Sequence, residues 1–290
     1  MTNHTSGRLY VVATPIGNLG DIGARAVDVL RSCALIAAED TRHTGVLLKH
    51  LGIETPQISL HDHNERARAP ELVARLREGA DIALVSDAGT PAISDPGFEL
   101  VRAAAAAGAS IIAIPGPCAA IAALSIGALP TDRFCFEGFL PARGAARRKR
   151  LETLAREPRT IVLYESPHRI GDTLEDCARA CGGERVAVIA REITKLHEQA
   201  YRGSLRELAQ LAAADQNIAR GEIVLLISGS PTGADDETHG GDGGTGRALD
   251  RALEILMAEL PLKQAARLAA QLTGARDNEA YKRALQLKKE

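Results

Sequence analysis

The stretch from residue 81 to residue 97, DIALVSDAGTPAISDPG, joins an apolar segment to a loop of unusual composition. The first six residues are predicted to form a buried strand, because a continuous apolar run bounded by turn residues is typical of a parallel sheet covered on both faces. The loop from 86 to 97 contains two aspartates, two prolines and two glycines. Ligands of open α/β sheets bind at the carboxyl ends of the strands, so we expect this loop to contribute to a binding site.

The same order of apolar strand, loop and helix recurs along the first 130 residues. Strands are predicted at 9–14, 34–39, 58–60, 81–86 and 110–114, and helices at 21–31, 44–51, 64–78, 95–107 and 117–126. Such alternation favours a parallel sheet with helices on both of its faces. The predicted fold class is therefore α/β.

A second α/β unit is predicted beyond residue 131. Its strands are expected at 134–139, 160–164, 185–191, 199–202 and 223–227, and its helices at 145–156, 169–181 and 205–214. The less regular alternation indicates a mixed sheet. The predicted division is an α/β domain at 1–131, a second α/β domain at 132–230, a linker at 231–246 and a helical module at 247–290.

The linker and the helical module differ sharply in composition. The linker is rich in glycine and aspartate and has almost no apolar residues, so we expect it to be flexible. In the module, Leu249, Leu253, Leu256 and Leu260 recur at helical spacing. Three short helices with tight turns are predicted there, an arrangement that resembles a helix-turn-helix module.

The overall composition is that of a globular protein and excludes several classes of function. The formal net charge of −2 means that any contact with RNA must come from local basic patches. Aromatic residues make up only 3%, which argues against a surface that stacks bases on aromatic rings. The five cysteines show no repeated short spacing, so neither a disulfide framework nor a zinc knuckle is expected. No apolar run of about eighteen residues occurs, and we expect a cytoplasmic protein that does not enter the membrane.

Two further loops follow predicted strands and contain glycine and proline: TPIGNLGD at 14–21 and IPGPCAA at 114–120. Glycine at a strand-to-helix turn lets a ligand approach the backbone. The first loop lacks the pattern of a dinucleotide fingerprint or a phosphate loop, and a tight structural turn is its alternative interpretation. For Cys118 in the second loop, a buried and unreactive thiol is the expectation.

Three further segments accompany these three loops along the chain: EDTRHT at 39–44, YESPHR at 164–169 and REITKLHE at 191–198. Together they resemble the tetrapyrrole methylase superfamily, and within it the bacterial enzymes that methylate the 2′-oxygen of a cytidine in the decoding centre of 16S rRNA. The resemblance covers about residues 8–228, and PLKQAARLAAQLTG and NEAYKRAL in the tail resemble the helix-turn-helix extension of such enzymes.

The resemblance implies two α/β domains with S-adenosylmethionine in the cleft between them. It further implies that 16S rRNA, within the 30S subunit, is the substrate and that the protein is a homodimer. The residues that it places at the methyl donor are Pro15, Gly17, Asp87, Gly89, Pro91, Ser94, Pro115, Gly116, Ala119 and Tyr164. No metal ion is expected, and His61, Asp62 and His63 are interpreted as a polar loop because no further His or Cys cluster completes a site.

Methylation of a ribose requires an activated oxygen, because a 2′-hydroxyl is a poor nucleophile until a base takes its proton or a cation favours its oxyanion. Polar runs after predicted strands supply the candidate catalytic residues Glu39, Arg42, Glu165 and Arg191. Each of the four residues also has an alternative interpretation that does not involve catalysis. Glu39 and Arg42 could form an ion pair, Glu165 could hold a helix start, and Arg191 could steer a phosphate. The sequence does not select the base.

A basic run at 143–150 contains five cations in eight residues. Arg147, Arg148 and Arg150 are predicted to contact the RNA backbone, with a solvated helix face as the alternative. Residues 246–290 hold nine Lys and Arg against six Asp and Glu, a modest excess that is compatible with a role in RNA binding.

Two other functions fit parts of this pattern. One is methylation of a carbon of a tetrapyrrole precursor, whose carboxylates would also require arginines. The other is a regulator that binds DNA through its helix-turn-helix tail and only senses a small ligand. The polar loops over two α/β units favour an active cleft over the regulator.

Overall fold

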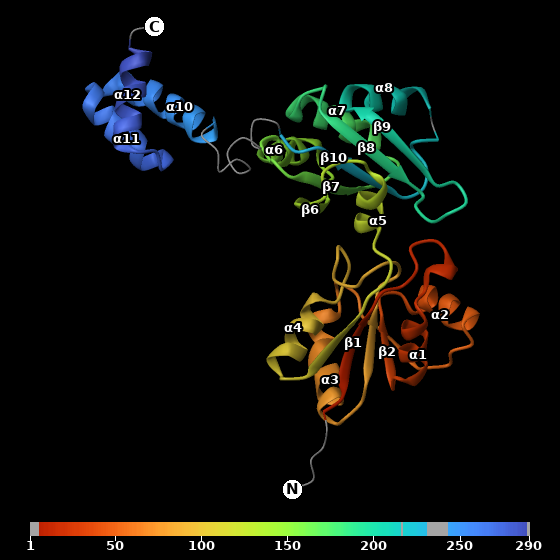
Figure 1. The fold of residues 1–290 in the computed structure, drawn as a ribbon. Coiled ribbons are helices and arrows are strands. Elements are labelled where there is room, and N and C mark those ends of the chain that lie inside the picture. The colour runs from red at the N-terminus through yellow and green to blue at the C-terminus, as the bar shows by residue number, and fades with distance from the viewer. Residues whose placement is uncertain (1–5, 216, 231–242, 289–290) are drawn as a thin grey trace.

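The computed structural model describes residues 6–215, 217–230 and 243–288. It contains two five-stranded sheets, one above the other in Figure 1, and a cluster of C-terminal helices. The α/β class and the two-sheet organisation predicted from the sequence are confirmed. Among the described residues, no helix combines the length and the apolarity that a membrane span requires.

The first sheet is entirely parallel, in the order β3-β2-β4-β1-β5. Its strands are β1 (Arg8–Val12), β2 (Leu35–Ala38), β3 (Gln57–Ser59), β4 (Ile82–Val85) and β5 (Ser110–Ile114). β2 and β4 are buried along their whole length, which explains why they appear in the sequence as continuous apolar runs. The carboxyl ends of all five strands meet at one edge, where the loops of interest begin.

Helices cover both faces of this sheet, as the alternation predicted. They are α1 (Ala24–Ser32), α2 (Thr41–His50), α3 (Glu65–Arg77) and α4 (Phe98–Ala106), with a short 3-10 turn, η1 (Leu19–Asp21), after β1. Apolar side chains of α1 and α2 pack on one face, and those of α3 and α4 pack on the other. Each helix thereby presents its start to the edge that holds the polar loops.

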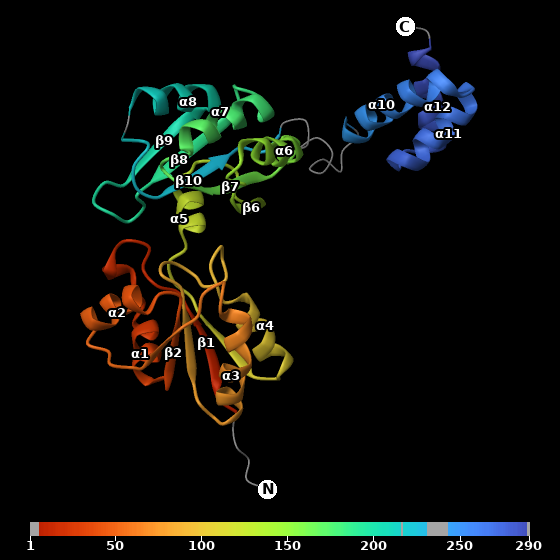
Figure 2. The same ribbon diagram turned by 180° about the vertical axis from the view of Figure 1, so that it is seen from behind.

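The next helix, α5 (Ala119–Ile126), leaves the first sheet and packs on the second. Ala120, Ala123 and Leu124 are buried against apolar residues of the second sheet. Both views show α5 directly beneath that sheet (Figures 1 and 2). The domain division at residues 131 and 132 stays a prediction, and this packing favours a boundary before α5.

The second sheet is mixed, as expected, with the order β6-β7-β10-β8-β9. Its strands are β6 (Phe134–Phe139), β7 (Thr160–Glu165), β8 (Val186–Arg191), β9 (Gln199–Ser204) and β10 (Ile223–Ile227). Only the β6–β7 pair is parallel. Helices α6 (Gly144–Leu154), α7 (Ile170–Cys181) and α8 (Leu205–Ala214) pack on the face opposite α5.

The tail consists of α10 (Gly243–Glu259), α11 (Leu262–Thr273) and α12 (Asp277–Leu287). Leu249 and Leu253 of the predicted stripe are buried among alanines of α11 and α12, so these helices have a core of their own. Gly274 ends α11 with φ 72°, a left-handed conformation that glycine adopts readily at a helix end. The prediction of a linker at 231–246 is wrong for its last four residues, which belong to α10, and residues 231–242 lie outside the described residues.

Candidate active site

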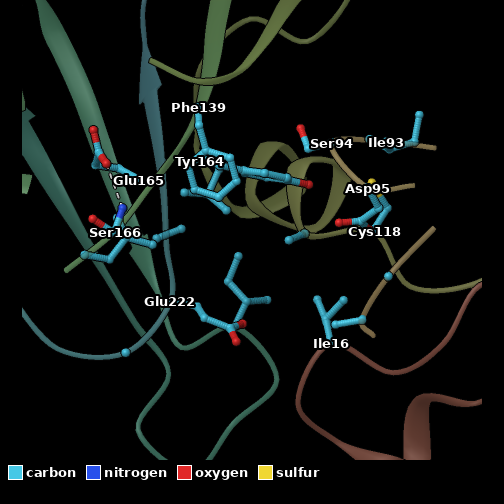
Figure 3. Close-up of a pocket in the computed structure, with 18 of the residues that line it drawn as sticks. Ile16, Ile93, Ser94, Asp95, Cys118, Phe139, Tyr164, Glu165, Ser166 and Glu222 are labelled. Carbon is cyan, nitrogen blue, oxygen red and sulfur yellow. Dashed lines mark hydrogen bonds between the residues drawn. The ribbon is translucent and has the colours of Figure 1, made fainter. Parts of the chain in front are cut away.

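A cavity of about 350 Å³ lies between the two sheets (Figure 3). We call it the central cavity. One wall comes from the first sheet and α5, and the other comes from the second sheet. Its lining residues are Ile16, Ala88, Gly89, Thr90, Ile93, Ser94, Asp95, Cys118, Ala119, Phe139, Tyr164, Glu165, Ser166, Pro167, Ala190, Ile193, Gly221, Glu222, Ile223 and Val224. A largely apolar pocket with a few polar groups is typical of small-molecule sites.

The loop after β4 forms most of the first wall. It is held to the loop after β1 by two hydrogen bonds, from the Thr14 amide to the Gly89 carbonyl (2.8 Å) and from the Gly89 amide to the Thr14 carbonyl (3.1 Å). Ala92 and Ser94 have φ angles of 67° and 64°, which are rare for residues with a side chain. Strained backbone of this kind concentrates at functional sites, as the composition of the loop led us to expect.

Four of the ten residues expected at the methyl donor line the central cavity: Gly89, Ser94, Ala119 and Tyr164. The other six support these loops from behind or flank them. Pro15 and Pro91 are buried, the Asp87 carboxylate accepts a hydrogen bond from the Asp40 amide (3.0 Å), and a Cβ on Gly116 would lie 3.0 Å from the Cβ of Ala13. Gly17 and Pro115 are exposed outside the lining. Whether any of the ten contacts the donor stays a prediction.

Tyr164 lies between the start of α5 and the aromatic side chains of β6. Its hydroxyl accepts a hydrogen bond from the amide of Ala120, at the start of α5 (3.2 Å). Its ring makes edge-to-face contacts with Phe136 and Phe139, whose centroids lie 5.1 and 5.6 Å away. Burial raises the pKa of the phenol, so Tyr164 stays neutral. The sequence analysis did not single out Phe139, although it ends a predicted strand opposite Tyr164 in the parallel β6–β7 pair.

Asp95 is the carboxylate of the first wall that lines the central cavity. In Figure 3 its side chain points across the cavity toward Tyr164. Burial, together with repulsion from Glu39, Asp87 and Asp62, raises the pKa of Asp95 to about 6. The sequence analysis placed Asp95 in the right loop but gave it no role.

Glu39 and Arg42 do not line the central cavity. One Glu39 carboxylate oxygen accepts a hydrogen bond from the Asp87 amide (3.1 Å), so Glu39 supports the loop that holds Asp95. Burial raises the pKa of Glu39. Arg42 pairs with Asp40 at 2.6 Å, and its side chain is 89% exposed. The ion pair expected between Glu39 and Arg42 is therefore wrong, because Asp40 takes the arginine.

Glu165 lines the central cavity, but its side chain is only 1% exposed and its carboxylate oxygens are bonded to other protein groups. It accepts hydrogen bonds from the Ser166 amide (2.8 Å) and the Thr173 hydroxyl (2.6 Å), and Arg169 lies 3.3 Å away. This geometry supports the structural interpretation of Glu165, which holds the start of α7.

Arg191 is also committed to structure, because it is 7% exposed and bonded to two loops. Its guanidinium donates to the Arg220 carbonyl (2.8 Å), the His197 carbonyl (3.1 Å) and the Gln199 side chain (3.3 Å). Phosphate steering by Arg191 does not fit this burial. Its hydrogen bonds instead fix the loops before β9 and β10.

Lys195 of the second wall contacts the loop after β1 on the first wall. Its ammonium pairs with Glu192 at 3.0 Å and with Glu222 at 3.2 Å. Its aliphatic chain lies across Gly17 of the other wall, where an added Cβ would be 2.5 Å from the lysine Cγ. Only glycine fits at this contact, which gives Gly17 a role in joining the walls.

The basic run on α6 is partly buried. Arg147 donates to Asp176 at 2.8 Å, and the two side chains are 6% and 4% exposed, which does not favour the predicted contact of Arg147 with RNA. Arg150 pairs with Glu137 at 2.6 Å. Arg148 is 52% exposed and lies 3.8 Å from Asp176. Of the three arginines, Arg148 is the most available to a partner.

The comparison with known families agrees with this architecture. The family described as Tetrapyrrole (Corrin/Porphyrin) Methylases matches residues 8–209, and the RsmI C-terminal HTH domain matches residues 244–288. The chain therefore belongs to the tetrapyrrole methylase family. Within that family it is similar over nearly its whole length to proteins named Ribosomal RNA small subunit methyltransferase I.

Two of these relatives show the extent of the similarity. The protein from Pseudomonas aeruginosa is 53% identical over 97% of this chain and 98% of its own length. The protein from Escherichia coli O157:H7 is 51% identical over 98% of this chain and 96% of its own length.

Solved structures share the fold at lower sequence identity. The methyltransferase CobJ superposes with a TM-score of 0.58 at 22% identity, covering 78% of this chain and 95% of its own. Uroporphyrin-III-C-methyltransferase from Thermus thermophilus gives a TM-score of 0.55 at 22% identity, covering 77% and 94%. These likenesses support the arrangement of the two sheets.

Proposed function

We propose that the protein transfers the methyl group of S-adenosylmethionine to the 2′-oxygen of a cytidine ribose in the decoding centre of 16S rRNA, in the cytoplasm. The observation that carries this proposal is the similarity to small-subunit rRNA methyltransferases, which extends over both sheets and the tail. The protein is thus a methyltransferase of the tetrapyrrole methylase family whose substrate is ribosomal RNA.

The central cavity fits the methyl donor chemically. Ile16, Ile93 and Val224 offer apolar surface to a nucleoside, and Gly89 lets the donor approach the backbone. When bound, the donor supplies an electrophilic sulfonium methyl group.

The remaining demands of the reaction fall on this chain. The hydrogen-bonded loops after β1 and β4 orient the reacting groups. Tyr164 holds the start of α5 on the second sheet through its hydrogen bond to Ala120. No group of three or more His, Cys, Asp or Glu side chains suited to a metal ion occurs in the part of the chain that the structure describes. Our proposal is that transfer requires no metal ion.

RNA is held, on this proposal, by exposed cations outside the central cavity. Arg148 on α6 is one, and Lys263 and Arg267 on α11 are others, because all three are exposed. The tail has its own core, which suits a separate module that contacts a second part of the 30S subunit. We also propose a homodimer, the state implied by the superfamily.

Methylation of a tetrapyrrole carbon is the second candidate, because the solved structures with this fold include uroporphyrin-III-C-methyltransferase. The similarity to those structures is 22% identity or less, whereas the rRNA methyltransferases reach 53%. The tail, which matches the RsmI C-terminal HTH domain, also favours RNA.

The test compares substrates directly. Purified protein with labelled S-adenosylmethionine is given 30S subunits, naked 16S rRNA and uroporphyrinogen, and ribose methylation is mapped in 16S rRNA from cells with and without the gene. We expect label in 30S subunits and the loss of one cytidine 2′-O-methyl group in the deletion strain. Transfer to uroporphyrinogen alone would establish the second candidate.

A further inference from the structure

Asp95 occupies a special position in the central cavity. It follows Ser94, whose φ is 64°, and precedes Pro96, so its backbone has little freedom. The same loop contacts the second sheet at Gly138, where an added Cβ would lie 2.8 Å from the Ser94 hydroxyl oxygen. The loop is thus fixed at both walls, and the Asp95 carboxylate points into the space between them (Figure 3).

The groups around Asp95 disfavour its charge. The carboxylates of Glu39 and Asp62 in neighbouring loops of the first sheet, and that of Asp87 in the same loop, oppose its ionisation. The Ser86 hydroxyl favours the ionised form, and Tyr164 and Cys118 adjoin Asp95 in the cavity. An unpaired carboxylate in such surroundings binds a proton more tightly than an exposed aspartate, yet is still ionised at neutral pH. A catalytic base needs both properties.

The other polar groups of the central cavity are less suited to this role. Glu165 is committed to Ser166, Thr173 and Arg169. Glu222 pairs with Lys195, and its side chain is 71% exposed. The phenol of Tyr164 accepts a hydrogen bond from the Ala120 amide, and its raised pKa keeps it protonated at neutral pH.

We infer that Asp95 is the catalytic base that takes the proton from the attacking ribose hydroxyl. This inference rests on the proposed function. As the hydroxyl oxygen forms its bond to the methyl carbon, the bond from that carbon to sulfur breaks and its electron pair stays on sulfur, which becomes the neutral thioether of S-adenosylhomocysteine. The hydroxyl proton passes to an Asp95 carboxylate oxygen and is later released to solvent. No oxidant, reductant or metal ion enters this balance.

The experiment uses the full-length variants Asp95→Asn and Asp62→Asn. Asp62 is exposed and does not line the central cavity, yet it acts on the charge of Asp95, so it is a matched control for loss of one nearby carboxylate. Single-turnover methyl transfer to 30S subunits is measured from pH 5 to pH 9, and S-adenosylmethionine affinity is measured by calorimetry. The folded state is checked by circular dichroism.

For the wild type we expect a rate that rises with pH up to about 6 and is constant above it, because only ionised Asp95 accepts the proton. Asp95→Asn should lower the rate by about 100-fold or more at pH 7.5 and abolish the rise, while donor affinity changes less than about threefold. Asp62→Asn should retain the rate at pH 7.5 and shift the rise to lower pH, because one repelling charge is gone.

Three outcomes would overturn the inference. They are an unchanged rate in Asp95→Asn, an unchanged pH profile, or a loss confined to donor affinity, which would make Asp95 a binding group for the cationic donor. If the wild type methylates no ribosomal RNA, the proposed function has failed. If the wild type is active and Asp95→Asn is equally active, only the role of Asp95 has failed.

Discussion

The two walls of the central cavity differ in what their charged side chains contact. On the side of the second sheet, Glu165 is bonded to the start of α7, and Arg191, which does not line the cavity, is bonded to carbonyl groups of two loops. On the wall from the first sheet, Asp95 faces the cavity among other carboxylates. Charges that hold loops together are buried and fully bonded, whereas a charge that takes part in chemistry must stay accessible. The comparison therefore assigns structure to the second wall and proton transfer to the first.

The largest effect on stability is expected from Glu165→Gln. This change leaves Arg169 without its buried anionic partner, and breaking such a pair costs about 3 kcal/mol. Urea denaturation should show this loss of unfolding free energy. At temperatures where the variant is folded, its methyl-transfer rate should stay within a few-fold of wild type. A large loss of rate with normal stability would contradict the structural role of Glu165, because Glu165 would then act in chemistry.

A second pair of variants tests the same distinction on α6. Arg147→Ala removes the buried partner of Asp176 and should destabilise the protein by about 2–3 kcal/mol, whereas Arg148→Ala should cost less than about 0.5 kcal/mol. For binding to 30S subunits, measured at several salt concentrations, we expect the larger effect from Arg148→Ala and the smaller one from Arg147→Ala. Arg148→Ala should flatten the salt dependence, because one fewer cation then contacts phosphate. An equal effect of both variants on stability would show that the exposure of Arg148 does not separate the two roles.

An intermediate effect is expected where Gly17 meets Lys195. Gly17→Ala adds a Cβ that would lie 2.5 Å from the lysine Cγ, at a backbone φ of 149°. We expect donor affinity to fall about tenfold, a loss of about 1.4 kcal/mol, because the walls are pushed apart. Adding Lys195→Ala should restore part of this loss, since it removes the obstructing chain. Gly23→Ala is the control, because no atom lies within 4 Å of its Cβ position. If the loss of donor affinity in the double variant equals the sum of the losses in Gly17→Ala and Lys195→Ala, the contact between Gly17 and Lys195 does not set the spacing of the walls.

The last effect is a change in stability with pH at Asp95. Its pKa in the folded protein, about 6, is above the value in the unfolded chain, so the folded state binds the proton more tightly. Ionisation of Asp95 therefore costs stability as the pH rises through 4 to 6 and beyond. Asp95→Asn should raise the Tm by several degrees at pH 8 and change it little at pH 4, because the cost of ionising Asp95 is present only at the higher pH. A lower Tm of the variant at pH 8 would show that the ionised carboxylate stabilises the fold.

Much of the fold could be predicted because its pattern is local. The alternation of strands and helices, the mixed second sheet and the special loop after β4 all follow from short stretches of sequence. Gly89, Ser94, Ala119 and Tyr164 were expected at the methyl donor and do line the central cavity. For these positions, strand ends and loop composition were sufficient.

The roles of charged residues could not be predicted, because their partners are distant in sequence. Arg147 is buried by Asp176, 29 residues away, so its place in a basic run was misleading. Arg191 bonds to backbone carbonyls, which leave no mark in the sequence. The charge state of Asp95 depends on Glu39 and Asp62, which come from other loops of the same sheet edge. Only the folded chain shows which acids remain accessible.

The most direct test measures Asp95→Asn and Glu165→Gln side by side, with the single-turnover methylation rate of 30S subunits and the unfolding free energy determined for each at pH 7.5. We predict that Asp95→Asn loses about 100-fold in rate and loses no stability. We also predict that Glu165→Gln loses about 3 kcal/mol of stability and retains its rate. The reverse result, with stability lost at Asp95 and rate lost at Glu165, would contradict the assignment of chemistry to the first wall.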